Sequence, residues 1–418
     1  MSAIPGILLL LVGLAISIAL HELGHLIFAK AFGVKVSRYF VGFGPTLWST
    51  KPGQTEYGIK AIPVGGFVAI AGMLAPAQPG TRTVDADGNL TAAETARQAA
   101  AAELEPGEEH QAFWRLPAGK KILVMFAGPF ANFILAGLGL ALSLSVIGQP
   151  VYLNQVGEIL PDSPAASSEL VIGDVIESWG GQPTANWEEL RAAIAAGGAA
   201  PVTVVVQRGA TQEEIILTPE LTDRPAVQDG KPVLDDAGKS VLVPTPWVGI
   251  GPAQDRQQLA LTQIPGKTGE LALGTGKVLL RLPVYLWDVA RSLLPGQARE
   301  AGIMGIWGVA DMAGSISAAP SASYTVTDRA GDLLLLLAAL NMSLFVFNLI
   351  PLLPLDGGHI LGAVIEGVRR PIARRFGRPD PGAFDTARWL PLSQIVIAFL
   401  IAMTVLLIVA DIVNPVSG

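Results

Sequence analysis

Four long apolar segments constrain this chain more than any other feature of its sequence. Each has roughly 20 or more predominantly apolar residues, the length that a helix needs to cross the hydrocarbon core of a bilayer. Of the 418 residues, 50% are hydrophobic and only 15% are charged, which excludes a disordered protein and disfavours an ordinary soluble globule. The sequence predicts an α-helical polytopic membrane protein with transmembrane helices over residues 4–32, 122–148, 333–355 and 389–410.

Composition also limits the chemistry. The chain has no cysteine, so disulfides, thiolate metal sites and cysteine nucleophiles are excluded, and a bound metal must be held by His, Asp or Glu. Its formal net charge of -7 offers no basic patch for a phosphate backbone, and we expect no nucleic-acid partner. Only four histidines are available as metal ligands: His21, His25, His110 and His359.

The distribution of basic residues predicts the orientation in the membrane. Six arginines and three acidic residues lie between residues 366 and 388, which places this loop in the cytoplasm. The stretch 151–332 has 12 basic and 21 acidic residues and suits the outer face. With four spans, both termini and this acidic region of a multi-pass membrane protein are expected to be extracytoplasmic.

The region after the second span reads as a small mixed α and β domain. Strand signals at 156–160 and 202–207 flank a helix opened by Asn186, with Glu189 at the capping-box position. The run ILPDSPAASSELVIGDVIESWGG (159–181) is similar to PDZ domains of the bacterial protease-associated kind. That resemblance implies an inserted, extracytoplasmic PDZ-like α+β domain that could bind peptide ends.

The remaining segments complete the expected organisation. Residues 271–294 carry four charges among their leucines and suit an amphipathic helix on the membrane surface. Two short strands, 41–50 and 56–70, are joined by a turn at Pro52 and Gly53 and predict a β-loop. The expected segments are a first transmembrane helix with the β-loop (1–74), a flexible cytoplasmic loop (75–118), a second transmembrane helix (119–149), the PDZ-like domain (150–262), the amphipathic helix and a connector (263–330), a third transmembrane helix (331–365), a basic cytoplasmic loop (366–388) and a fourth transmembrane helix (389–418).

The first span contains His21, Glu22 and His25 in the sequence HELGH. On a helix the two histidines lie one turn apart on one face and can coordinate one metal ion. Glu22 beside them can accept a proton from metal-bound water. The alternative is that they are polar helix-end residues facing a headgroup layer. Ionisable side chains inside a span are costly and by default mark a function, which favours the metal site.

A catalytic zinc ion usually has three protein ligands, so HELGH alone is incomplete. Asp356 is the acidic residue at the end of the third span, within NLIPLLPLDGGHI. Pro351 and Pro354 break the helix there, and we expect Asp356 to lie on an unwound segment that can turn toward the metal. The alternative is an Asp-Gly turn where the helix leaves the membrane. His359 is a ligand by proximity or, as we favour, a group that supports the ligands.

The sequence allows more than one role for some of the remaining polar residues. Asn132 in the second span is expected to hydrogen-bond between helices or to line the cavity. His110 lies in a polar loop and is expected to be solvated.

Together HELGH, AGPFANF (127–133), the PDZ-like domain and NLIPLLPLDGG resemble the site-2 protease family of intramembrane zinc metalloproteases, in its bacterial branch with a PDZ domain. The resemblance implies that His21, His25 and Asp356 ligate one zinc ion per chain and that Glu22 is the general base. It also implies that Asn348 contacts substrate or the oxyanion, and that the β-loop is a membrane-associated element beside the active site.

The resulting functional prediction is an intramembrane zinc metalloprotease that cleaves transmembrane helices of single-span membrane proteins. Such regulated intramembrane proteolysis acts, for example, on an anti-sigma factor or a remnant signal peptide. The alternative is a non-enzymatic membrane adaptor or sensor with a structural metal site and a peptide-binding PDZ-like domain. The glutamate of HELGH argues against the alternative, because a structural site needs ligands and no base.

Overall fold

The computed structural model describes residues 2–78, 80–225, 227–228, 231–232, 241–294, 299, 302–319 and 324–415. The chain forms two compact units. One holds residues 1–145, 260–294 and 299–418, and the other holds residues 146–259. The first unit contains the helices that carry the predicted site.

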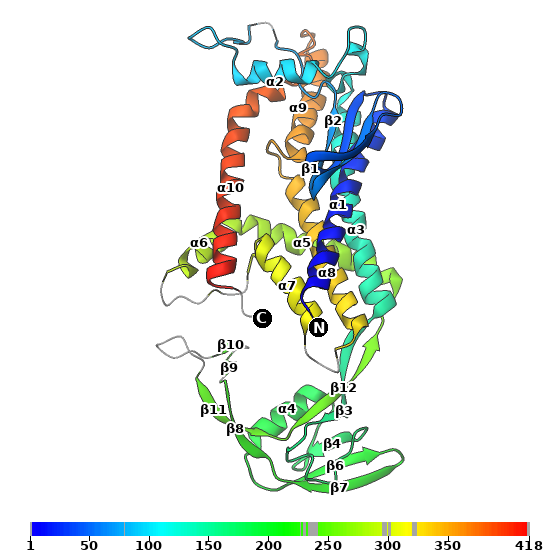
Figure 1. The fold of residues 1–418 in the computed structure, drawn as a ribbon, viewed down its shortest axis with the longest axis vertical. Coiled ribbons are helices and arrows are strands. Elements are labelled where there is room, and N and C mark those ends of the chain that lie inside the picture. Colours follow the sequence, from blue (N-terminus) through cyan, green and yellow to red (C-terminus); the bar gives the residue numbers. More distant parts are fainter. Residues whose placement is uncertain are drawn as a thin grey trace. The chain divides into compact units, whose positions relative to one another are not determined.

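Four helices among the described residues are long and apolar enough to cross a membrane, which confirms the predicted number of spans. They are α1 (Ile4–Ala31), α3 (Ala118–Leu140) with the π-helical turn η3 (Ala141–Ile147), α8 (Val326–Asn348), and α10 (Leu390–Val413) with the preceding 3-10 turn η5 (Thr386–Trp389). Helices α1, α3 and α8 pack against one another (Figure 1). Helix α10 lies apart from them along most of its length.

The third span differs from its expected limits at both ends. It begins seven residues earlier, at Val326, because Thr325 and Asp328 form a reciprocal capping box that starts the helix. It ends at Asn348, before the prolines at 351 and 354. A new helix, α9 (Asp356–Arg375), then begins, so Asp356 is the first residue of a helix and not part of an unwound segment. Residues 366–375, expected in the basic loop, belong to α9.

The β-loop is a hairpin of two antiparallel strands, β1 (Val36–Thr50) and β2 (Glu56–Ile70). Strand β2 has the expected limits, and β1 begins five residues earlier than expected. Gly53 in the turn has a φ of 79°, a backbone conformation that glycine adopts without strain. The hairpin lies against α1, where the Tyr39 hydroxyl donates a 2.8 Å hydrogen bond to the Ala19 carbonyl.

Residues 75–118 contain more regular structure than the expected flexible loop. They form helix α2 (Ala92–Ala101) and two 3-10 turns, η1 (Glu109–Gln111) and η2 (Phe113–Arg115). Thr91 caps α2 by accepting the Glu94 N–H, and an alanine-rich run with high helix propensity follows. Arg97 of α2 forms a buried ion pair of 2.7 Å with Asp385, which fastens α2 beside η5.

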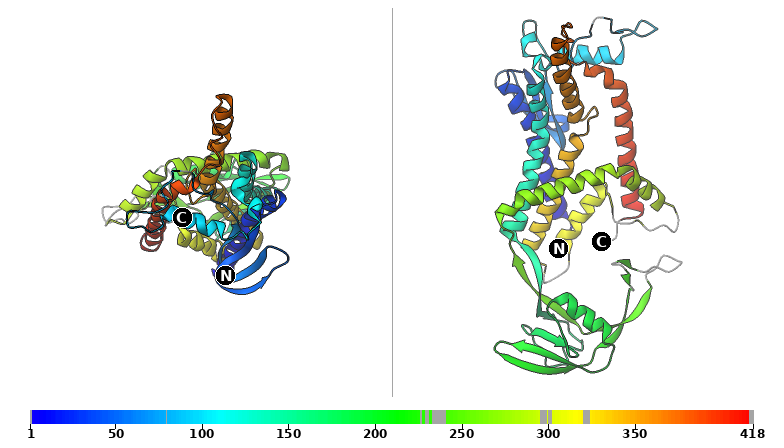
Figure 2. Two further views of the ribbon diagram at one scale, coloured as in Figure 1. Left: turned by 90° about the horizontal axis from the view of Figure 1, so that it is seen from above. Right: turned by 180° about the vertical axis from the view of Figure 1, so that it is seen from behind.

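The amphipathic segment forms two helices, α5 (Ile264–Leu280) and α6 (Leu282–Ser292), instead of one helix over 271–294. The break lies at Arg281, two residues before Pro283, and proline is favourable in a first helical turn and unfavourable inside a helix. Both helices run across the direction of the spans (Figures 1 and 2). The connector after them includes helix α7 (Ile306–Ala318).

The second unit is a mixed α and β domain, as predicted. Its main sheet has the order β12-β3-β4-β6-β7, and helix α4 (Trp187–Ala196) begins at Asn186, whose side chain accepts the Glu189 N–H at 2.9 Å. Ile176, Leu190 and Val204 are central in its core. The strands are β3 (Gln149–Ile159), β4 (Val175–Trp179), β5 (Gln182–Pro183), β6 (Val202–Arg208), β7 (Thr211–Leu217), β8 (Glu220–Pro225), β9 (Val227–Gln228), β10 (Lys231–Pro232), β11 (Leu242–Trp247) and β12 (Ile250–Gln257).

Candidate active site

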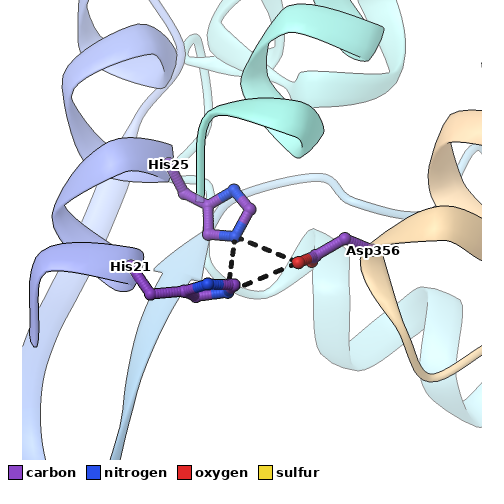
Figure 3. Close-up of side chains that lie close together, drawn as sticks. All are labelled: His21, His25 and Asp356. Carbon is purple, nitrogen blue, oxygen red and sulfur yellow. Dashed lines mark hydrogen bonds and ion pairs between the residues drawn. The ribbon is translucent and has the colours of Figure 1, made fainter. Parts of the chain in front are cut away.

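The fold brings together the three side chains predicted to hold a metal. His21 and His25 project from α1, and Asp356 projects toward them from the start of α9 (Figure 3). The Nε2 atoms of the two histidines are 3.3 Å apart, and each is 3.4 Å from Oδ2 of Asp356. These three atoms lie within 4.8 Å of one another, close enough to bind a single ion.

Two glycines allow α1 and α3 to approach closely beside these ligands. A Cβ atom added to Gly24, inside HELGH, would lie 2.4 Å from the Ala127 carbonyl oxygen. A Cβ atom added to Gly128 would lie 2.1 Å from Nε2 of His25. Both separations are too short for a side chain, so glycine at these positions is what lets α3 form one wall of the site.

A backbone carbonyl fixes the ring of His25. Its Nδ1 lies 2.8 Å from the Val124 carbonyl oxygen of α3, and His25 is buried. A carbonyl can only accept a hydrogen bond, so Nδ1 carries the proton and Nε2 is left with a free lone pair. That tautomer directs the lone pair of Nε2 toward His21 and Asp356.

The other predicted residues line a cavity of about 310 Å³ at the same place. Glu22, Asn348 and His359 all lie on its wall together with the three ligand candidates. Hydrophobic residues from β2, α3 and the segments after β2 and α8 complete the lining: Phe67, Val68, Ile70, Met73, Met125 and Pro354. A general base, a polar amide and a metal site can therefore act on one bound peptide.

The donor set fits a catalytic zinc ion. Two imidazole nitrogens and one carboxylate oxygen are three protein ligands, the number that leaves a coordination position for water. Oδ2 of Asp356 is buried and has no hydrogen-bond partner among the described residues, so it is free to coordinate. His359 lines the cavity but does not belong to the three-atom cluster that the described residues form.

His110 is exposed, and its Nδ1 lies 3.1 Å from the Gly107 carbonyl oxygen, apart from the residues that line the cavity. Sequence reasoning missed Gly24 and Gly128 as determinants of the site. Their signal was present, since Gly24 lies inside HELGH and Gly128 inside AGPFANF. It could not be interpreted until the pairing of the two helices was known.

A cavity that joins a His-Glu-x-x-His helix to a carboxylate, within a bundle of helices able to cross a membrane, defines a membrane-embedded metallopeptidase. The model of peptidase family M50 matches residues 9–378, and the chain belongs to that family. The chain is also similar along its whole length to zinc metalloprotease Rip1 of Mycobacterium tuberculosis, with 31% identity over 100% of this chain and 99% of the relative.

Other relatives are less similar. Metalloprotease MmpA of Caulobacter vibrioides is 29% identical over 89% of this chain and 90% of its own length. Zinc metalloprotease RasP of Oceanobacillus iheyensis is 26% identical over 87% and 91%, respectively. The predicted resemblance to the site-2 protease family is confirmed.

Proposed function

We propose that this peptidase hydrolyses peptide bonds in the transmembrane segments of other membrane proteins, with His21, His25 and Asp356 as zinc ligands and Glu22 as general base. The observation that carries the proposal is the clustering of three ligand atoms within 4.8 Å beside Glu22, on a helix apolar enough to span a bilayer. A structural metal site would need no base at this position, so the geometry disfavours a non-enzymatic adaptor.

The chain is a zinc metalloprotease that acts within the membrane, as its family and relatives support. Zinc bound at this site supplies a Lewis acid for the scissile carbonyl and lowers the pKa of the attacking water. The protein residues perform the other tasks. Glu22 accepts the proton of the attacking water and delivers it to the leaving amine, and the Asn348 side-chain amide donates a hydrogen bond to the developing oxyanion.

The substrate must reach the site in an extended form, because the carbonyls of a helix are shielded by their intrahelical hydrogen bonds. Strand β2 contributes Phe67, Val68 and Ile70 to the cavity wall. An unwound segment could pair with the hairpin by strand addition, which presents a backbone carbonyl to Glu22. Single-span membrane proteins fit this requirement, and an anti-sigma factor or a remnant signal peptide would be examples.

Charge distribution supports an orientation of the chain in a bacterial plasma membrane. Four arginines on α9 and two more before α10 place the end of α9 and the loop after it in the cytoplasm. Both termini and the unit of residues 146–259 would then be extracytoplasmic. This unit, which has the helix cap and strands expected of a PDZ-like domain, would bind the exposed ends of proteins.

One experiment tests the catalytic assignment. Purified Glu22→Ala should retain one zinc ion per chain and lose cleavage of a single-span substrate in detergent, because Glu22 is a base and not a ligand. Asp356→Ala should lose zinc, and His359→Ala should retain more of it. Loss of zinc from Glu22→Ala, or wild-type zinc binding by Asp356→Ala with loss from His359→Ala, would contradict the assigned roles.

A second experiment tests the orientation. The chain has no cysteine, so single cysteines can be introduced without a background signal. Ser167 and Pro379 are both exposed. In intact cells an impermeant thiol reagent should modify Ser167→Cys and leave Pro379→Cys unmodified until the cells are lysed. The opposite pattern would invert the proposed topology.

A further inference from the structure

The two histidines of the metal site differ in the surroundings of their second ring nitrogen. Nδ1 of His25 donates to the Val124 carbonyl oxygen. Nδ1 of His21 is buried and has no hydrogen-bond partner among the described residues. A histidine that binds a metal almost always donates its other N–H to an acceptor, which fixes the ring orientation and raises its basicity. His21 therefore requires an acceptor near Nδ1.

Asn132 of α3 is the residue with the matching property. It is 1% exposed, and neither its Nδ2 nor its Oδ1 has a hydrogen-bond partner in the described part of the chain. A fully buried amide with both ends unpaired is rare, because burying such a group without hydrogen bonds is unfavourable. Its location inside a membrane span makes the requirement for a partner stronger.

The register of the two helices places Asn132 beside His21. Gly128 lies directly against the His25 ring. Helices α1 and α3 are consecutive spans and run in opposite directions. The residue one turn before His25 on α1 therefore lies at the same level as the residue one turn after Gly128 on α3. The residues at those positions are His21 and Asn132.

Helix α8 adds a third polar group to the same interior. The Asn341 amide donates to Ser17 Oγ at 2.9 Å and to the Leu337 carbonyl oxygen at 2.9 Å, and its Oδ1 has no partner among the described residues. Ser17 lies one turn from His21 on α1. Each of three adjoining helices thus carries a buried polar atom without a hydrogen-bond partner among the described residues, at levels within about one helical turn of His21.

We propose that Asn132 is a positioning residue: its Oδ1 accepts the Nδ1–H of His21 across one bridging water molecule. This contact holds the His21 ring in the tautomer that presents the Nε2 lone pair to the metal, as the Val124 carbonyl does for His25. The inference rests on the proposed role of His21 as a ligand. A bridging water would have the two to four polar partners that buried waters have, because Asn341 Oδ1 is available as a further acceptor.

Zinc affinity of the purified full-length chain, measured by competition with a chelator, tests the proposal independently of cleavage. Asn132→Leu keeps a similar volume and removes the acceptor, and it should weaken zinc binding by roughly 10 to 100-fold. Asn132→Asp keeps an acceptor oxygen and should bind zinc within a few-fold of wild type. Ser143→Ala is the matched control, since the buried Ser143 of η3 donates to the Gly331 carbonyl oxygen of α8, away from the site, and this variant should bind zinc as wild type does.

Wild-type affinity in Asn132→Leu would overturn the proposal. So would an affinity in Asn132→Asp as low as that of Asn132→Leu, because it would show that packing and not the acceptor matters. His21→Ala separates this outcome from a failure of the ligand assignment. If His21→Ala loses zinc while Asn132→Leu keeps it, the metal site stands and only the positioning role is wrong; if His21→Ala keeps zinc, the ligand assignment itself is wrong.

Discussion

Substitution of Gly128 by alanine should disable the metal site from outside its ligand set. The added methyl group would lie 2.1 Å from Nε2 of His25, about 1.3 Å short of the 3.4 Å at which ordinary van der Waals contact begins. His25 is buried and held by Val124, so its ring cannot turn away without losing that hydrogen bond. Displacement of α3 instead would open the close contact between Gly24 and Ala127.

The size of this displacement determines the expected effect. Metal–ligand distances in a working site hold to within about 0.2 Å, so a shift of about 1.3 Å removes His25 from coordination. Loss of only an outer hydrogen-bond partner of a ligand costs roughly 10 to 100-fold in metal affinity, and loss of the ligand itself should cost more. We therefore expect Gly128→Ala to lower zinc affinity by more than about 100-fold and to abolish cleavage.

Chelator competition on purified protein measures this loss, and Gly119 supplies the control on the same helix. A Cβ atom at Gly119 meets no heavy atom within 4 Å. Gly119→Ala should leave zinc affinity unchanged, because the added methyl group contacts no neighbouring atom. Wild-type zinc affinity in Gly128→Ala would refute the argument that close helix packing positions His25.

Two further predictions concern the parts outside the spans. Arg97→Ala should destabilise the packing of α2 by roughly 1–3 kcal/mol, because Asp385 loses its 2.7 Å buried partner and keeps only the longer, 3.3 Å contact with the exposed Arg388. Faster proteolysis of residues 75–115 should report this loss, whereas Arg38→Ala, which removes a more exposed pair, should cost under about 1 kcal/mol. Burial raises the pKa of Asp174, but the hydrogen bonds from Arg208 outweigh it and hold this pKa below its usual range. The contribution of Asp174 to stability is therefore present above its unfolded pKa of about 3.9 and is lost as the pH falls below that value. In the wild type, hydrogen-exchange protection of β4 and β6 should decrease in acid for this reason. In Asp174→Asn this decrease should be smaller.

The spans could be predicted from the sequence because hydropathy over about 20 residues is a local property. Their ends could not be predicted as well, since these depend on contacts. Asp328 and Arg329 interrupt the apolar pattern of the third span, yet the capping box at Thr325 and burial against neighbouring elements keep them helical. The expectation that Asp356 lies on an unwound segment is wrong for the same reason. A new helix begins at Asp356, two residues after Pro354.

The candidate site, like the spans, could be predicted from the sequence only in part. HELGH can be recognised from spacing because a helix places residues four apart on one face. The identity of the third ligand depends on a contact between residues more than 300 positions apart, and spacing left Asp356 and an ordinary turn as alternatives. The structure brings Asp356 to both histidines, whereas His359 lies three residues further along α9.

The placement of charge within the spans explains how such a site can exist in a bilayer. Lys121 with Glu366, and Arg299 with Asp411, form buried ion pairs of 2.6 and 2.9 Å near the ends of α3 and α10. Outside the first and last seven residues of each described span, Glu22 is the one formally charged residue. Because an isolated charge in hydrocarbon is costly, Glu22 requires the polar cavity that the histidines, Asp356 and Asn348 form around it. The same cavity supplies the water that hydrolysis consumes, so the conditions that stabilise Glu22 in the membrane are also those that the reaction needs.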